Sequence, residues 1–106
     1  MPKTYKQKDL EKLSTIIAVS DAARLWSFRC AQEFAKKGDW GSCVLGAGIG
    51  VWMVPTGKRK AEEVILIHPP HTAGQGSCSW ETSTDEVIAS LKVAGIDAHY
   101  ICGHLD

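Results

Sequence analysis

The chain has 106 residues, of which 44% are apolar and 23% are charged, a composition typical of a folded domain. Twelve Lys and Arg residues balance twelve Asp and Glu residues, so the formal net charge is zero. This balance disfavours a nucleic-acid-binding protein, because affinity for nucleic acids depends on positive charge facing the phosphates. No stretch is apolar over the roughly 20 residues needed to cross a bilayer, so we expect no membrane contact.

The cysteines bear on the compartment and on cofactors. The N-terminal residues are charged, so we expect no signal peptide and a cytoplasmic location, where thiols stay reduced. The spacing of Cys30, Cys43, Cys78 and Cys102 contains no Cys-x-x-Cys pair, and we therefore expect no structural zinc and no cofactor. Cys30 and Cys102 fit the role of small apolar residues in the core.

The first third of the chain carries the apolar period of α-helices. Thr4 and Gln7 have the spacing of a capping box, and an apolar stripe starts at Leu10. Ser20 and Asp21 mark either the cap of a second helix or a break within one long helix. We therefore expect one or two helices at the N-terminus.

The middle third shows the pattern of a β-hairpin. Residues 42–54 alternate with a period of two: odd positions are apolar, whereas three glycines and then Trp52 occupy even positions. The bare face admits either a flat ligand beside Trp52 or a helix packed unusually close, and we favour the helix. A turn at residues 55–58 then leads into the apolar run 64–67, which completes an antiparallel hairpin.

The last third predicts a crossover. After a long loop over residues 69–82, Ser83 and Glu86 have the spacing of a second capping box, and Gly95 ends that helix. Residues 97–102 form the final strand, which we expect to run parallel to the second hairpin strand. The whole chain is thus expected to be a single α+β domain, a two-layer sandwich of helices on a sheet.

This topology gathers reactive side chains at one edge of the sheet. The first hairpin strand begins beside the end of the second, so Cys43 is expected near His68 or His71. The last strand would carry His104 to the same edge, and the long loop would hang Trp80 over it. Ligands of α/β sheets commonly bind at such an edge. The residues expected to contact a ligand are Trp52, Trp80 and His104.

A cysteine beside a histidine is the minimum that a thiol-dependent enzyme requires. Cys43 would be the nucleophile, and His68 or His71 would be the base that forms its thiolate. The segment Gly41-Ser42-Cys43, followed by strand, turn, strand and His68, resembles the chemoreceptor glutamine deamidase family. That family has its catalytic Cys in a Gly-Ser-Cys segment and its His at the end of a later strand. The resemblance implies a small Cys–His hydrolase or deamidase.

A metal site is a second alternative, with His68, His71 and Asp85 as the candidate ligands. His68-Pro69, followed by segment 82–85 opening a helix, looks like the His-x-His-Pro and Ser-x-x-Asp pattern of JAB/MPN zinc isopeptidases. Leu66 stands in the place of the first histidine. The resemblance therefore implies a degenerate JAB/MPN-like relative that has lost its metal.

A non-enzymatic role is the leading hypothesis. An amphipathic N-terminal helix can dock on a copy of itself, and two-fold homodimers are the commonest assembly. A partner would also cover Gly-rich edge strands. We therefore expect a binding or interaction module that forms a homodimer and that binds a protein or a small molecule.

Overall fold

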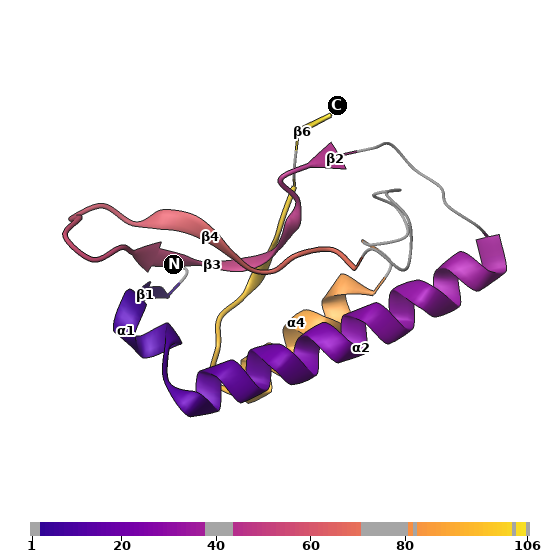
Figure 1. Cartoon of the computed structure of the whole chain (residues 1–106), viewed down its shortest axis with the longest axis horizontal. Coiled ribbons are helices and arrows are strands. Elements are labelled where there is room, and N and C mark those ends of the chain that lie inside the picture. Colours follow the sequence, from indigo (N-terminus) through magenta and orange to yellow (C-terminus); the bar gives the residue numbers. More distant parts are fainter. Residues whose placement is uncertain (1–2, 38–43, 71–80, 82, 103, 106) are drawn as a thin grey trace.

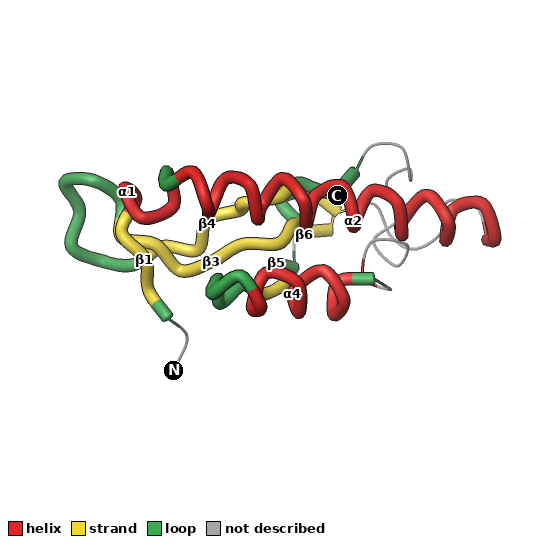
Figure 2. Tube along the Cα trace, turned by 90° about the horizontal axis from the view of Figure 1, so that it is seen from below, coloured by secondary structure: helices red, strands yellow, loops and turns green. Residues whose placement is uncertain are grey.

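The structure is a computed structural model that describes residues 3–37, 44–70, 81, 83–102 and 104–105. Its elements are β1 (Thr4–Lys6), α1 (Gln7–Leu10), α2 (Leu13–Lys37), β2 (Val44–Leu45), β3 (Gly48–Val54), β4 (Glu62–Ile67), α4 (Thr84–Val93), β5 (His99–Ile101) and β6 (His104–Leu105). Helices α2 and α4 lie side by side on one face of the main sheet (Figures 1 and 2). The predicted α+β sandwich is confirmed.

Strand β3 is the centre of the main sheet. It pairs antiparallel with β4 on one edge. On the other edge it pairs parallel with β1 and antiparallel with β5. Strand β5 therefore runs in the same direction as β4, as predicted, although β3 lies between them. The hairpin turn is also confirmed: Lys58 N donates to the Pro55 carbonyl at 3.0 Å, and Gly57 supplies a positive φ of 81°.

The N-terminus differs from the prediction, because its first residues form a strand. Strand β1 pairs with residues 52–54 of β3 and buries Tyr5. The Tyr5 hydroxyl accepts a hydrogen bond from Asp97 N at 2.7 Å and donates one to the Gly95 carbonyl at 3.2 Å. The capping box predicted over residues 4–7 is therefore wrong, since sheet pairing takes up its first position and the N-cap of α1 makes no side-chain hydrogen bond.

Two helices follow, but they separate earlier than expected. The chain turns at Glu11 and Lys12, whereas α2 runs unbroken through Ser20 and Asp21. A helix of 25 residues is about 37 Å long at 1.5 Å per residue. This length accounts for most of the longest dimension of the molecule, 43 Å.

The core lies between the sheet and the helix pair. Trp26 and Cys30 of α2, Leu91 of α4, and Ile49 and Val51 of β3 are fully buried there. The buried positions on α2 are four residues apart and those on β3 are two apart, as the periods of a helix and a strand require. The helices therefore bury one stripe each and leave their opposite faces outside the core.

Helix α4 begins and ends where the sequence predicts. Ser83 is the N-cap, although its side chain makes no capping hydrogen bond. Gly95 has a φ of 86°, and its N–H donates to the Lys92 carbonyl while Ile96 N donates to the Leu91 carbonyl. These two bonds form a Schellman motif, which satisfies the last carbonyls of the helix.

The long first strand of the predicted hairpin is divided in two. Gly46, with a φ of 77°, turns the chain between β2 and β3, and β2 pairs with β6 in a small sheet of its own. The register nevertheless continues: Gly48 lies opposite Ile101, and Leu45 lies opposite His104. Strands β5 and β6 thus follow β3 and β2 as one antiparallel ladder with an interruption.

The glycines of β3 are explained by neighbouring strands and not by a helix. A Cβ at Gly48 would come within 2.7 Å of the Ile67 carbonyl oxygen and of the Ile65 side chain. A Cβ at Gly50 would overlap the Val64 carbonyl oxygen, beside a register shift in the ladder. The favoured expectation of a closely packed helix is wrong, because these atoms belong to β4.

Candidate interaction surface

The edge predicted to hold the thiol site is only partly described. Strand β6 pairs with β2 there, so the backbone of His104 lies opposite that of Leu45. Cys43, His71 and Trp80 lie outside the described residues. The predicted approach of a histidine to Cys43 therefore stays a prediction.

The candidate metal ligands that the structure describes lie on different elements. His68 is exposed just beyond β4, and Asp85 is exposed in the first turn of α4. The third candidate, His71, lies outside the described residues. Within the described part of the chain, no group of three His, Cys, Asp or Glu side chains is arranged to hold a metal ion. The metal hypothesis stays a prediction that depends on His71.

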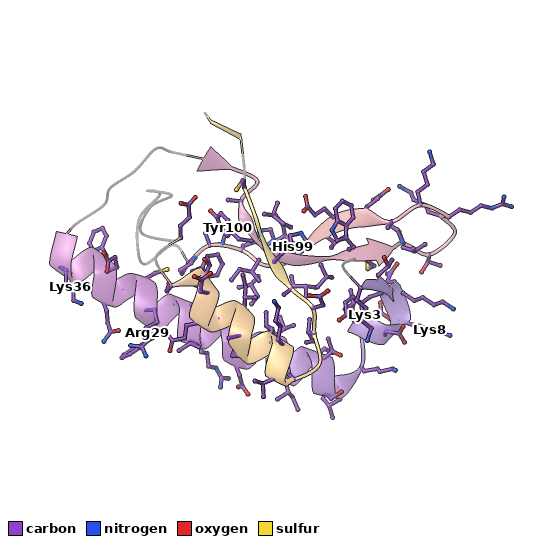
Figure 3. The ribbon with its side chains drawn as sticks, turned by 180° about the vertical axis from the view of Figure 1, so that it is seen from behind. Lys3, Lys8, Arg29, Lys36, His99 and Tyr100 are labelled. Carbon is purple, nitrogen blue, oxygen red and sulfur yellow. The ribbon has the colours of Figure 1, made fainter. Side chains whose placement is uncertain are left out.

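Trp52 belongs to a polar and aromatic cluster on the sheet. Its ring stacks on that of His99, with centroids 6.2 Å apart and the planes inclined by 24°. His99 Nε2 lies 2.6 Å from Glu63 Oε2, and Figure 3 shows His99 on β5. The sequence analysis missed His99 and Glu63, although alternation along the last strand places His99 on the opposite face from Tyr100. The cluster ties β3, β4 and β5 together.

The two described thiols differ in burial. Cys30 is fully buried, with its Sγ 3.7 Å from Ser83 Oγ. Burial raises the pKa of the Cys30 thiol, the charge of Glu33 raises it further, and the Ser83 contact opposes both. Cys102 is exposed, which corrects the expectation of a core role: it lies one residue beyond β5, where the pairing with β3 has ended.

Alkylation of the folded protein is expected to separate these thiols. Cys102 should react readily at neutral pH. Cys30 should react at least about tenfold more slowly than Cys102, because it is buried and little of it is thiolate. The Cys30 rate should rise with pH and should match that of Cys102 in denaturant. Mass spectrometry of iodoacetamide-treated protein measures both sites, and equal rates in the folded protein would contradict this assignment. The same experiment measures the alkylation rate of Cys43.

The outer face of the helical layer exposes large apolar side chains. Leu13 is 73% exposed on α2, and Val93 is 90% exposed on α4. The other exposed large apolar residues of α2 are Ile16, Ile17, Phe28 and Phe34. Contiguous apolar patches on a protein surface commonly mark interaction sites. The sequence signal for them is a second apolar stripe on α2, on the side opposite to its core stripe.

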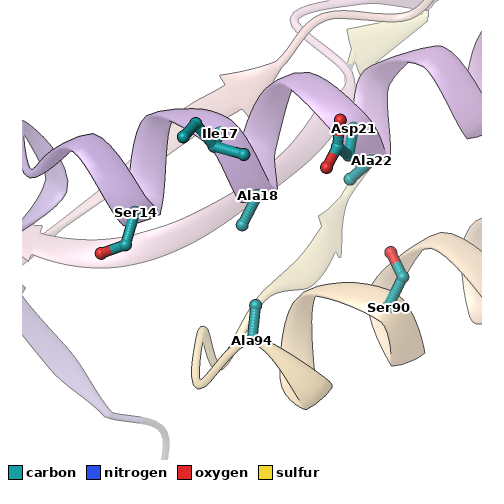
Figure 4. A pocket seen from close by; sticks show the side chains of 7 residues that line it. All are labelled: Ser14, Ile17, Ala18, Asp21, Ala22, Ser90 and Ala94. Carbon is teal, nitrogen blue, oxygen red and sulfur yellow. The ribbon is translucent and has the colours of Figure 1, made fainter.

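A groove between the two helices adds shape to this face. It has a volume of about 510 Å³ and is lined on α2 by Ile17, Ala18 and Asp21 among others, and on the other side by Ser90 of α4 and by Ala94 just after α4 (Figure 4). Small side chains line its α4 wall, which leaves room for a side chain from outside. The surface formed by this groove and by the exposed side chains of Leu13, Ile17, Phe28 and Val93 is called the helical face below.

An ion pair fixes the spacing of the two helices further along. Arg29 of α2 donates from Nη2 to Glu86 Oε1 of α4 at 3.0 Å, and its Nε lies 2.9 Å from Glu86 Oε2. The contact thus consists of one hydrogen bond from Nη2 and a close ionic approach of Nε, which makes no hydrogen bond within the described part of the chain. This half-exposed ion pair joins α2 to α4, so both helices contribute to the helical face.

Comparison with known proteins found no match for this chain among protein-family models, curated proteins and solved structures. Among the described residues, no helix is long and apolar enough to cross a membrane. Inference about function therefore starts from the geometry of the helical face.

Proposed function

We propose that this protein is a non-enzymatic interaction module that self-associates through the helical face. The observation that carries the proposal is the exposure of Leu13, Ile17, Phe28 and Val93 beside an open groove. Each would bury apolar area in a complex at roughly 25 cal/mol per Å². Their burial against a partner surface would therefore favour association.

A second copy of the chain is the partner that the helical face fits. The groove accepts a projecting apolar side chain, and the same face supplies one in Phe28, so the surface can complement itself across a two-fold axis. The location we propose is the cytoplasm, consistent with the free thiol of Cys30 in the core. A further protein or small-molecule partner would bind the assembled dimer.

Sedimentation velocity tests self-association directly. Concentrations from about 1 μM to 1 mM cover association free energies of about −8 to −4 kcal/mol, and the wild type should shift from monomer to dimer within them. Ile17→Asp should remain monomeric throughout, because a charge would replace an apolar contact of the helical face. A wild type that stays monomeric to the highest concentration would overturn the proposal.

The neighbouring residue provides a matched control. Ile16 is 52% exposed and Ile17 is 51% exposed, yet Ile16 lies on the flank of α2 and does not line the groove. Ile16→Asp introduces the same charge and the same loss of helix propensity one position away. It should dimerise like the wild type, and equal loss in both variants would contradict the use of this face.

A further inference from the structure

The exposed side of α2 carries a second pattern besides its apolar residues. Positions spaced alternately by three and four residues fall on one line along a helix, which is the seam of a coiled coil. On α2 these positions are Ser14, Ile17, Asp21, Arg24, Phe28, Ala31 and Ala35. Ile17 and Phe28 are exposed, and so are the charged side chains between them, at 68% for Asp21 and 81% for Arg24. The line is called the seam below.

The order of residues along the seam is symmetric in chemistry. On each side of its midpoint, a charged residue lies next to the middle and an apolar residue lies beyond it. These residues are Asp21 and Ile17 in one half, and Arg24 and Phe28 in the other. An antiparallel copy would therefore place Ile17 against Phe28 of the second copy and Asp21 against Arg24 of the second copy. Within one chain, Asp21 and Arg24 form an ion pair of 3.8 Å between two exposed side chains. Such an exposed pair contributes little stability, so it can be exchanged for a pair across the interface at little cost.

The charges also determine the direction of pairing. In a parallel arrangement Asp21 would face Asp21 and Arg24 would face Arg24, and like charges across an interface are repulsive. Sliding an antiparallel copy along by seven residues would place Ile17 against Asp21 in one direction and Arg24 against Phe28 in the other, and either slide removes the contact of Ile17 with Phe28. Among these arrangements, one register satisfies both the apolar and the charged positions.

We propose that two copies pair α2 against α2 in antiparallel orientation, around a two-fold axis midway between Asp21 and Arg24. This inference rests on the proposed self-association and specifies its geometry. The symmetric interface contains two apolar contacts of Ile17 with Phe28 and two ion pairs of Asp21 with Arg24. It leaves α4 beside the seam, where Val93 borders the second copy.

Charge reversal tests the pairing. Asp21→Arg alone and Arg24→Asp alone should each weaken dimerisation about tenfold or more, because every ion pair becomes a like-charge contact. Mixing the two variants should restore a one-to-one heterodimer, because the arginine introduced in one chain then faces the aspartate introduced in the other. Both positions are exposed, and circular dichroism checks that each variant folds. A mixture that stays monomeric would overturn the register.

Crosslinking tests the direction. The antiparallel register places Ser14 beside Ala31 of the second copy, and both residues are exposed. In a background in which Cys43, Cys78 and Cys102 are replaced by Ser, oxidation of mixed Ser14→Cys and Ala31→Cys proteins should give a disulfide-linked dimer. Ser14→Cys alone should give little, and efficient linkage of that variant to itself would show parallel pairing and overturn the inference.

The outcomes separate the two proposals. A monomeric wild type removes both the proposed function and this inference. In a second outcome, the wild type dimerises and Ile17→Asp dissociates it, but the mixed charge variants stay monomeric and the mixed cysteine variants form no disulfide. That outcome supports self-association through the helical face and overturns the antiparallel α2 geometry alone.

Discussion

Gly50→Ala is expected to destabilise the fold by about 2 kcal/mol or more, although it adds a single methyl group. The added Cβ would overlap the carbonyl oxygen of Val64 and approach Ile101 Cδ1 to 2.6 Å. A backbone carbonyl cannot move aside without breaking the ladder between β3 and β4, so the strands themselves must separate. Urea denaturation, monitored by tryptophan fluorescence, measures the loss as a lower midpoint.

Gly57→Ala is the matched control for Gly50→Ala. Gly57 lies in the hairpin turn with a φ of 81°, and a Cβ there would meet nothing within 4 Å. Its replacement costs only the left-handed backbone strain, about 1 kcal/mol. The ranking matters more than either value: if Gly50→Ala unfolds at the urea concentration of the wild type, the close approach of β3 and β4 is wrong.

The pattern of alternating residues predicts which faces of the elements are buried, but not which strands are neighbours. The hairpin, the α4 crossover and the direction of β5 all follow from period and turn residues. The N-terminal strand does not, because three residues around Tyr5 carry no alternation that distinguishes a strand from a helix start. Pairing with β3, some 48 residues later in the chain, decides that assignment.

The glycine row shows the same limit at the scale of one contact. Bare positions predict close approach, and that expectation was right for Gly48 and Gly50. What approaches them depends on a register shift between β3 and β4, which no local pattern encodes. The sequence therefore predicted the close packing and named the wrong partner, a helix.

The candidate site is less predictable than the fold, for a physical reason. Residues with reactive or aromatic side chains can be recognised in a sequence by type, and Cys43, His68 and Trp52 were predicted as site residues for that reason. A binding surface consists of ordinary residues such as Leu13 and Ile17, which look identical to core residues until the direction of the helix face is known. Self-association was predicted from an amphipathic N-terminal helix, whereas the seam required the exposed side of α2.

Trp26→Ala is expected to have the larger effect on stability, a loss of about 3–5 kcal/mol. Trp26 is fully buried between α2 and the sheet, among Ile49, Val51 and Leu91, and its removal leaves a void that these side chains cannot fill. Domains of this size are commonly stable by about 5–15 kcal/mol, so one substitution removes a large part of the margin. Chemical denaturation measures the change, and Trp26→Phe, which keeps a ring in place, should lose less.

Phe28→Ala separates burial from aromaticity on the same helix. Phe28 lies two positions after Trp26 and is 59% exposed. Its truncation should therefore lower the free energy of unfolding of the monomer by no more than about 0.5 kcal/mol. The measurement belongs at low protein concentration, where dimer dissociation does not contribute to the unfolding midpoint. Equal losses for Trp26→Ala and Phe28→Ala would mean that α2 docks on the sheet through a different stripe, and the seam would then lie inside the core. A large loss confined to Trp26→Ala places the seam outside, where a second copy can reach it.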